Sequence, residues 1–158
     1  MIGETEIPDM VCWNTGFGGA FYFYPVDRAR LVEDCENDAF ADWIRRTYGA
    51  RLVVEEAAVP RALFDALRGG YDASLPENVA IANADHFSWP VTPEFEYYGE
   101  NFYTIEGFRR AVESFRGESG QDVFCNLLAS LLEDVAARAQ ELDGGSSARG
   151  FGIMVTGP

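Results

Sequence analysis

Short runs of apolar residues alternate along the chain with longer segments in which apolar residues recur every three or four positions. The short runs are rich in aromatic and β-branched residues and are bounded by Gly, Pro or charged residues, which is typical of strands. Pro25 is expected to end the second run. The pattern predicts five strands, at 10–13, 20–25, 51–56, 78–83 and 150–157.

The longer segments predict helices. The first begins at Asp27, keeps helical spacing as far as Tyr48, and is either one helix or two. The second begins at Pro60, a favourable first residue for a helix, and ends before Gly69 and Gly70.

Two more helices are expected in the second half of the chain. Thr104 can cap a helix that runs to Phe115, because its hydroxyl can accept a bond from a backbone N–H of the first turn. The last helix has the widest apolar stripe of the chain. Its members are Val123, Phe124, Leu127, Leu128, Leu131, Leu132 and Val135.

About five strands and four or five helices in mixed order predict a single α+β domain over residues 1–158. We expect the helices to pack mainly on one face of a small mixed sheet. A chain of 158 residues is the usual size of one domain, and its apolar fraction of 47% is enough for one sizeable core. The segments at 15–21 and 149–155 share a Gly-Phe-Gly pattern, which indicates two strands with close backbone approach.

The charge balance narrows the class of partner. Twelve basic residues, all of them Arg, stand against 26 acidic ones, and the formal net charge is −14. Such a surface repels phosphate backbones and anionic lipids and attracts cationic proteins. We therefore expect no direct binding of nucleic acid or membrane. The absence of lysine also removes the P-loop phosphate ligand and the Schiff-base nucleophile.

Composition also sets expectations about compartment and cofactors. Cys12, Cys35 and Cys125 are far apart and form no C-x-x-C pair, which favours reduced thiols and a cytoplasmic location. The N-terminal residues lack the features of a signal peptide, and no segment is long and apolar enough for a membrane span. One histidine and three scattered cysteines do not make a zinc site, so we expect no metal and no cofactor.

An acidic stripe lies on the first predicted helix. Asp34, Asp38 and Asp42 follow one another at intervals of four, with Glu33 and Glu36 beside them. Like charges at this spacing weaken a helix by a few tenths of a kcal/mol per pair, so the stripe is either a solvated face or a surface for a partner. Four helical residues advance the axis by roughly 6 Å, similar to the spacing of phosphates along a nucleic-acid strand.

A second candidate surface is the aromatic segment at 90–103. Carboxylates placed around aromatic side chains are typical of interfaces that bind arginine-rich partners. The alternative is a loop that covers the core with its aromatic side chains. Under either interpretation we expect Tyr97 or Tyr98 to face solvent. The candidate residues are Glu94, Glu96, Tyr97, Tyr98 and Glu100.

Three hypotheses about function follow. The first is a small acidic inhibitor that docks on a basic, nucleic-acid-acting enzyme; in size, acidity and lack of catalytic motifs the chain is similar to anti-restriction, anti-CRISPR and toxin-immunity proteins. The second is an enzyme that uses His86 with a cysteine, or a carboxylate pair among Glu94, Glu96, Glu100 and Glu106. The third is a homodimeric subunit whose aromatic segment forms the dimer contact.

Overall fold

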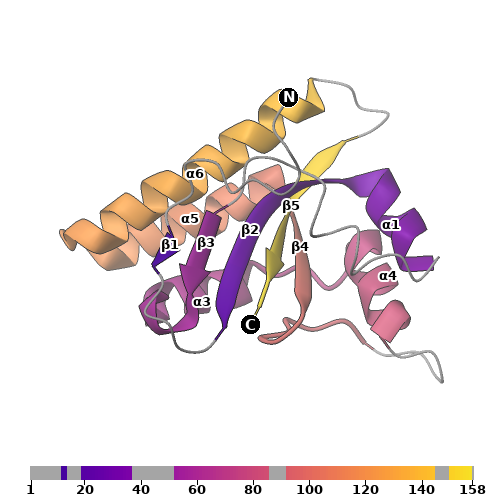
Figure 1. Ribbon diagram of the computed structural model, residues 1–158, viewed down its shortest axis with the longest axis horizontal. Coiled ribbons are helices and arrows are strands. Elements are labelled where there is room, and N and C mark those ends of the chain that lie inside the picture. Colours follow the sequence, from indigo (N-terminus) through magenta and orange to yellow (C-terminus); the bar gives the residue numbers. More distant parts are fainter. Residues whose placement is uncertain (1–11, 14–18, 37–51, 86–91, 145–149, 158) are drawn as a thin grey trace.

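The computed structural model describes residues 12–13, 19–36, 52–85, 92–144 and 150–157 (Figure 1). Within these ranges the chain forms a five-stranded sheet with helices on both faces. The strands are β1 (Cys12–Trp13), β2 (Ala20–Asp27), β3 (Leu52–Glu55), β4 (Glu100–Thr104) and β5 (Phe151–Thr156). The helices are α1 (Arg28–Glu36), the short 3₁₀ helix η1 (Glu56–Ala58), α3 (Arg61–Gly70), α4 (Pro76–Asp85), α5 (Ile105–Ser119) and α6 (Val123–Asp143).

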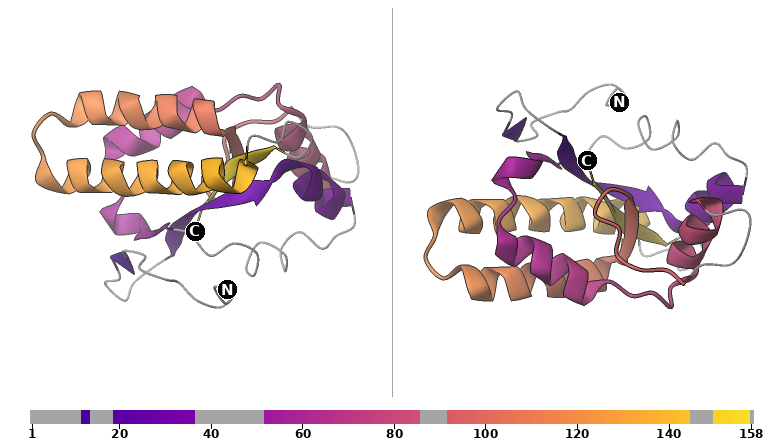
Figure 2. Two further views of the ribbon diagram at one scale, coloured as in Figure 1. Left: turned by 90° about the horizontal axis from the view of Figure 1, so that it is seen from above. Right: turned by 90° about the horizontal axis from the view of Figure 1, so that it is seen from below.

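The strand order is β1-β3-β2-β5-β4, so the last strand in sequence lies in the interior of the sheet. β1 is parallel to β3, and the other neighbours are antiparallel. The expected α+β domain is therefore confirmed. Figure 2 shows α5 and α6 side by side along the sheet with α3 next to them, and α1 and α4 together at the other end.

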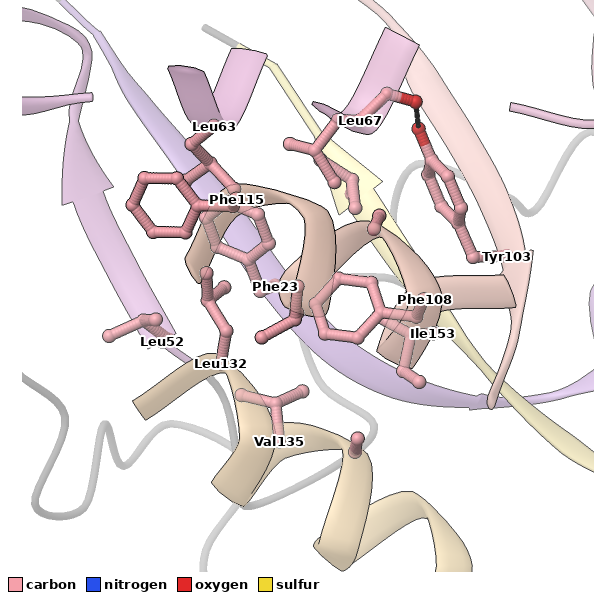
Figure 3. Close-up of a cluster of buried hydrophobic side chains, with 14 of the residues drawn as sticks. Phe23, Leu52, Leu63, Leu67, Tyr103, Phe108, Phe115, Leu132, Val135 and Ile153 are labelled. Carbon is pink, nitrogen blue, oxygen red and sulfur yellow. Dashed lines mark hydrogen bonds between the residues drawn. The ribbon is translucent and has the colours of Figure 1, made fainter. Parts of the chain in front are cut away.

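Alternation along the strands divides the buried side chains between two cores. Phe21 and Phe23 of β2 face α3, α5 and α6 and belong to the larger core, part of which is drawn in Figure 3. Tyr24 and Val26 of the same strand face α1 and α4 and belong to a smaller core. Three helices cover one face, and two cover part of the other, which the sequence pattern did not distinguish.

Two predicted elements change type or place. The apolar run at 78–83 is part of helix α4 and not a strand, because a short buried run has no periodicity of its own. Pro76 at the first helical position and Glu77 in the first turn are the start signals that identify this helix. The fifth strand is instead β4, at Glu100–Thr104, which overlaps the end of the aromatic segment at 90–103.

Pro25 does not end its strand. β2 continues to Asp27, and Pro25 lies opposite Ile153 of β5. On its other side, within the described residues, β2 pairs with β3 from Ala20 to Phe23.

The helix ends also differ in detail. Gly69 and Gly70 form the last residues of α3 and do not lie beyond it. Thr104 caps α5 as expected, with its Oγ1 accepting from Gly107 N at 2.9 Å, and the helix runs on to Ser119.

The close backbone approach expected at the second Gly-Phe-Gly is present at Gly152. A Cβ on this residue would lie 2.3 Å from Cζ of Phe102, so the ring of Phe102 occupies the space above the glycine. The first Gly-Phe-Gly, at 16–18, lies outside the described residues.

Candidate functional site

The segment that leads into β4 has side chains that alternate between exposed and half-buried. Glu94, Glu96 and Tyr98 are exposed, whereas Phe95 and Tyr97 pack against the larger core. Tyr98 is 74% exposed, which meets the expectation for the tyrosine pair. The segment therefore covers the core with one set of side chains and presents carboxylates and a tyrosine to solvent with the other.

The inward-facing rings hold this segment against α3. The ring of Phe95 meets the ring of Phe64 edge to face, with centroids 5.5 Å apart. Tyr97 lies 5.0 Å from Phe64 and 5.2 Å from Phe21. Tyr98 in turn touches Tyr97 edge to face at 4.8 Å, so the exposed ring stands on a rigid aromatic base.

Asn101 fixes the backbone of the same segment. Its Oδ1 accepts from Glu96 N at 2.8 Å, and its Nδ2 donates to Glu96 O at 2.9 Å and to Val155 O at 3.2 Å. The turn that follows closes with Gly99 N donating to Glu96 O, and Gly157 N donates to Gly99 O. Glu96 and its neighbours are thus tied to β5 through a buried side chain.

Carboxylates from two distant parts of the chain converge around Tyr71. Burial, followed by the charges of Glu96, Glu94 and Asp72, raises the pKa of Tyr71 to about 12. Asp72 itself is held in a turn, because its Oδ1 accepts from both N and Oγ of Ser74, and these bonds lower the pKa of its carboxyl group.

Asp72 is a site residue that sequence reasoning missed. The Asp-Ala-Ser sequence predicts a local turn, but its approach to the 94–96 segment depends on the path of the chain through α4. We call Asp72, Glu94, Glu96 and Tyr98 together the Tyr98 surface.

Tyr97 forms a polar contact next to this surface. Its hydroxyl donates to Oε2 of Glu56 in the short helix η1. Burial, and after it the bond to Glu56, raises the pKa of Tyr97 to about 12. Glu100 is half-buried at the start of β4 and opposite Thr156.

The acidic stripe of the first helix lies elsewhere. Glu33 is exposed on α1, and Asp34 and Glu36 belong to the same helix, whereas Asp38 and Asp42 lie outside the described residues. α1 leaves the sheet where Asp27 pairs with Phe151, and the Tyr98 surface lies near the opposite end of β5, where Glu100 pairs with Thr156 (Figure 1). A six-residue strand spans roughly 17 Å, so the two groups of candidate residues form separate surfaces.

The carboxylates and cysteines proposed for catalysis also lie in different parts of the structure. Glu106 is in the first turn of α5, beyond the far end of β4 from Glu94 and Glu96. Cys35 is buried in the smaller core, and Cys125 packs against the larger one. Burial raises the pKa of the Cys125 thiol despite a hydrogen bond with Ser119 that lowers it, which opposes formation of a thiolate nucleophile.

His86 and Cys12 cannot be placed in such a site. His86 lies outside the described residues, and Cys12 is described only as part of β1. In the part of the chain that the structure describes, no three His, Cys, Asp or Glu residues gather as a metal-binding group. Over the same residues, no helix combines the length and the apolar character that crossing a membrane requires.

Comparison with protein-family models, with curated proteins and with solved structures finds no match to this chain.

Proposed function

We propose that the protein is a small acidic binding module that docks through the Tyr98 surface on a cationic protein. The observation that carries the proposal is a segment that exposes Glu94, Glu96 and 74% of the Tyr98 side chain, with Asp72 close enough for its charge, like theirs, to act on Tyr71. A large exposed aromatic ring on a segment with exposed charges of one sign is the arrangement expected of an interface anchor and its rim.

The physical roles of the two kinds of side chain differ. The ring of Tyr98 would lose its water on docking and supply contact area, with little loss of side-chain entropy because Tyr97 and the aromatic base already restrict it. The carboxylates would pair with arginines or lysines of the partner. The net charge of −14 would attract that partner over distances set by the salt concentration.

A nuclease or another nucleic-acid-binding enzyme is the partner class that fits this charge. Such enzymes present cationic grooves, and a rigid set of carboxylates can occupy one in place of phosphates. A protein that docks in this way would act as an inhibitor of the anti-restriction, anti-CRISPR or toxin-immunity type. The exposed glutamate of α1 and its acidic neighbours would form a second, separate contact if the partner is large enough to reach both ends of the sheet.

The experiment compares two double variants that change net charge equally. Glu94→Arg with Glu96→Arg reverses two charges of the Tyr98 surface, and Glu118→Arg with Asp134→Arg reverses two exposed charges on α5 and α6. Wild-type protein is first used to capture a partner from host lysate at low salt, with release at high salt. Association rates of that purified partner with all variants are then measured by surface plasmon resonance.

We expect the first double variant to associate at least about tenfold more slowly and the second to remain close to wild type. A third variant, Glu33→Arg with Asp34→Arg, tests the α1 surface in the same way. Equal slowing by the first two variants would show general charge attraction and no docking at the Tyr98 surface. Loss confined to the third variant would move the docking site to α1 and overturn the assignment.

A further inference from the structure

A hollow of about 410 Å³ lies between α3 and η1, next to the Tyr98 surface but lined by other side chains. Its volume is within the range of small-molecule sites, roughly 300–1,000 Å³. Phe21, which is 2% exposed, forms an apolar floor. The remaining lining residues are Glu56, Val59, Arg61, Phe64, Arg68 and Tyr97.

Two guanidinium groups flank an aromatic ring on one side of this hollow. Arg61, Phe64 and Arg68 stand at positions i, i+3 and i+7 and so share one face of α3. The guanidinium carbon of Arg68 lies 4.5 Å from the centroid of the Phe64 ring. Among the described residues, the ion-pair partner of Arg61 is Asp65, at 3.6 Å between two exposed side chains.

Arg68 differs from most of the arginines that the structure describes. Among the residues that the structure describes, no carboxylate lies within ion-pair distance of its guanidinium group. Several donors of Arg68 are therefore available to an anion, in a fork geometry that suits carboxylate or phosphate oxygens.

The opposite wall offers an acceptor. Oε2 of Glu56 accepts the hydroxyl of Tyr97, which fixes the carboxylate at the edge of the Tyr97 ring. The other oxygen, Oε1, has no hydrogen-bond donor among the described residues. The hollow thus combines cationic donors, the rings of Phe64 and Tyr97, which are tilted by 55° to each other, and one carboxylate acceptor.

We infer that this hollow binds a small planar anion whose ring carries an N–H donor. The anionic group pairs with Arg68 and Arg61, the ring lies against Phe64 and Tyr97, and the N–H donates to Oε1 of Glu56. Guanosine monophosphate, whose base carries a ring N–H, and an indole carboxylate share this chemistry. The inference does not depend on the proposed function, because none of the four residues of the Tyr98 surface lines the hollow.

The test is calorimetric titration of the full-length protein with guanosine monophosphate and with indole-3-acetate. Guanosine and inorganic phosphate are the controls for the nucleotide, since each lacks one half of the proposed recognition. Naphthalene-1-acetate is the control for indole-3-acetate, because it keeps the ring size and the charge but has no N–H. We expect one of the two ligands to bind at least about tenfold more tightly than its controls, and the one that binds identifies the ligand class.

Three variants locate the binding. Arg68→Gln is expected to weaken binding at least about tenfold, because a charge-assisted bond is lost. Arg110→Gln removes the same charge from α5, where Arg110 is exposed and lines a different hollow, and should leave binding unchanged. Glu56→Gln keeps an acceptor for Tyr97 and should weaken indole-3-acetate while leaving naphthalene-1-acetate unaffected.

Equal weakening by Arg68→Gln and Arg110→Gln would overturn the inference, since it would show only general attraction of an anion. Binding of inorganic phosphate as tight as that of the nucleotide, or no binding of either ligand at millimolar concentration, would also overturn it. Folding of each variant is checked by thermal unfolding. The rate of partner association is also measured with the Arg68→Gln variant. It should not change, which would show that this hollow and the Tyr98 surface are separate sites.

Discussion

The side-chain amide of Asn78 forms two hydrogen bonds with the backbone of Phe102. Phe102 N donates to Asn78 Oδ1 at 2.9 Å, and Asn78 Nδ2 donates to Phe102 O at 3.0 Å. Phe102 is in the middle of β4, the last strand in the sheet order, so an asparagine of α4 takes the place of a neighbouring strand. The amide satisfies buried backbone groups and blocks pairing with another chain at this point.

Asn78→Ala is therefore expected to destabilise the protein strongly. The change leaves the buried N–H and C=O of Phe102 without this partner, each at a cost of about 1–3 kcal/mol, and also removes the bond to the carbonyl oxygen of Asp72, so we expect a loss of about 2–6 kcal/mol in the free energy of unfolding. Urea denaturation measures it. Asn126→Ala is the matched control, because the amide of Asn126 makes a single exposed bond of 3.3 Å to Gly120 O. Similar losses in the two variants would contradict the role given to Asn78.

The side-chain amide of Asn101 likewise forms two hydrogen bonds with the backbone of Glu96, and its loss should weaken partner binding as well as stability. Asn101→Ala keeps every charge of the Tyr98 surface but frees the backbone of Glu96. We expect weaker partner association and faster hydrogen exchange at the amides of Glu96 and Gly99. Leu128→Ala is the comparison here, since it lowers stability by removing a buried apolar side chain of α6 and takes away no hydrogen bond of this turn or of Asp72. If both variants bind the partner equally well, the turn does not position the carboxylates for docking.

The ion pair between Arg28 and Glu77 joins α1 to α4. Arg28 Nε lies 2.8 Å from Glu77 Oε2, its Nη2 lies 3.3 Å from Oε1, and the guanidinium group is 5.4 Å from the Phe102 ring centroid. The Glu77 side chain is buried but that of Arg28 is one-third exposed, so we expect Glu77→Gln to cost about 1–3 kcal/mol, less than for a fully buried pair.

A double-mutant cycle with Arg28→Gln measures the coupling in that pair directly. Glu141→Gln is the control, because the contact of Glu141 with Arg138 joins more exposed side chains and is expected to be worth about 1 kcal/mol or less. A coupling energy no larger than that of the control pair would show that α1 and α4 are held together by packing alone.

Adjacent leucines of α6 should respond very differently to substitution. Leu128 is fully buried in the larger core, whereas Leu127 is 49% exposed and Val123, one turn earlier, is 82% exposed. We expect Leu128→Ala to cost about 2–5 kcal/mol, and Leu127→Ala to cost less than about 1 kcal/mol. Urea denaturation checks both, and equal losses would mean that Leu127 is covered in solution.

The same helix shows how far hydrophobic pattern reaches. Its stripe predicted α6 correctly, because helical spacing persists over many turns and Asp122 provides a cap by accepting from Cys125 N. The pattern could not predict that Val123, in the first turn of α6, is exposed, since burial depends on which other elements pack against that turn. Thr104 was also a readable signal, because a cap acts on the residues beside it in sequence.

Contacts between residues far apart in sequence could not be predicted, because no local pattern determines them. The register of β4 between Asn78 and β5, and the approach of Asp72 to Glu94 and Glu96, are set by pairing between residues far apart in sequence. The stripe of Asp34, Asp38 and Asp42 was a local pattern, but Asp38 and Asp42 lie outside the described residues, so its helical spacing remains a prediction. The pattern of Arg61, Phe64 and Arg68 was also local and was passed over, because its meaning depends on Glu56 and Tyr97 across the hollow.

Alkaline pH should destabilise the protein partly through Tyr97. Burial and the bond to Glu56 raise its pKa to about 12 in the folded state, against 10.0 for an ordinary tyrosine. The folded protein therefore holds this proton more tightly than the unfolded chain does. The resulting stabilisation is complete below a pH of about 10 and is lost as the pH rises from about 10 to about 12.

Unfolding free energies measured over this pH range, together with tyrosinate absorbance, test the assignment. Wild-type stability should fall as the pH rises, and the stability of Tyr97→Phe should fall less steeply because one titrating hydroxyl has been removed. The variant should still lose some stability, because Tyr71 and Tyr103, whose pKa values are also raised, remain in place. Glu56→Gln should bring the pKa of Tyr97 closer to 10.0 by removing the adjacent charge, and so move the loss of stability to lower pH. Identical pH profiles for wild type and Tyr97→Phe would show that the hydroxyl of Tyr97 titrates alike in the folded and unfolded chains, and that its bond to Glu56 does not hold the proton.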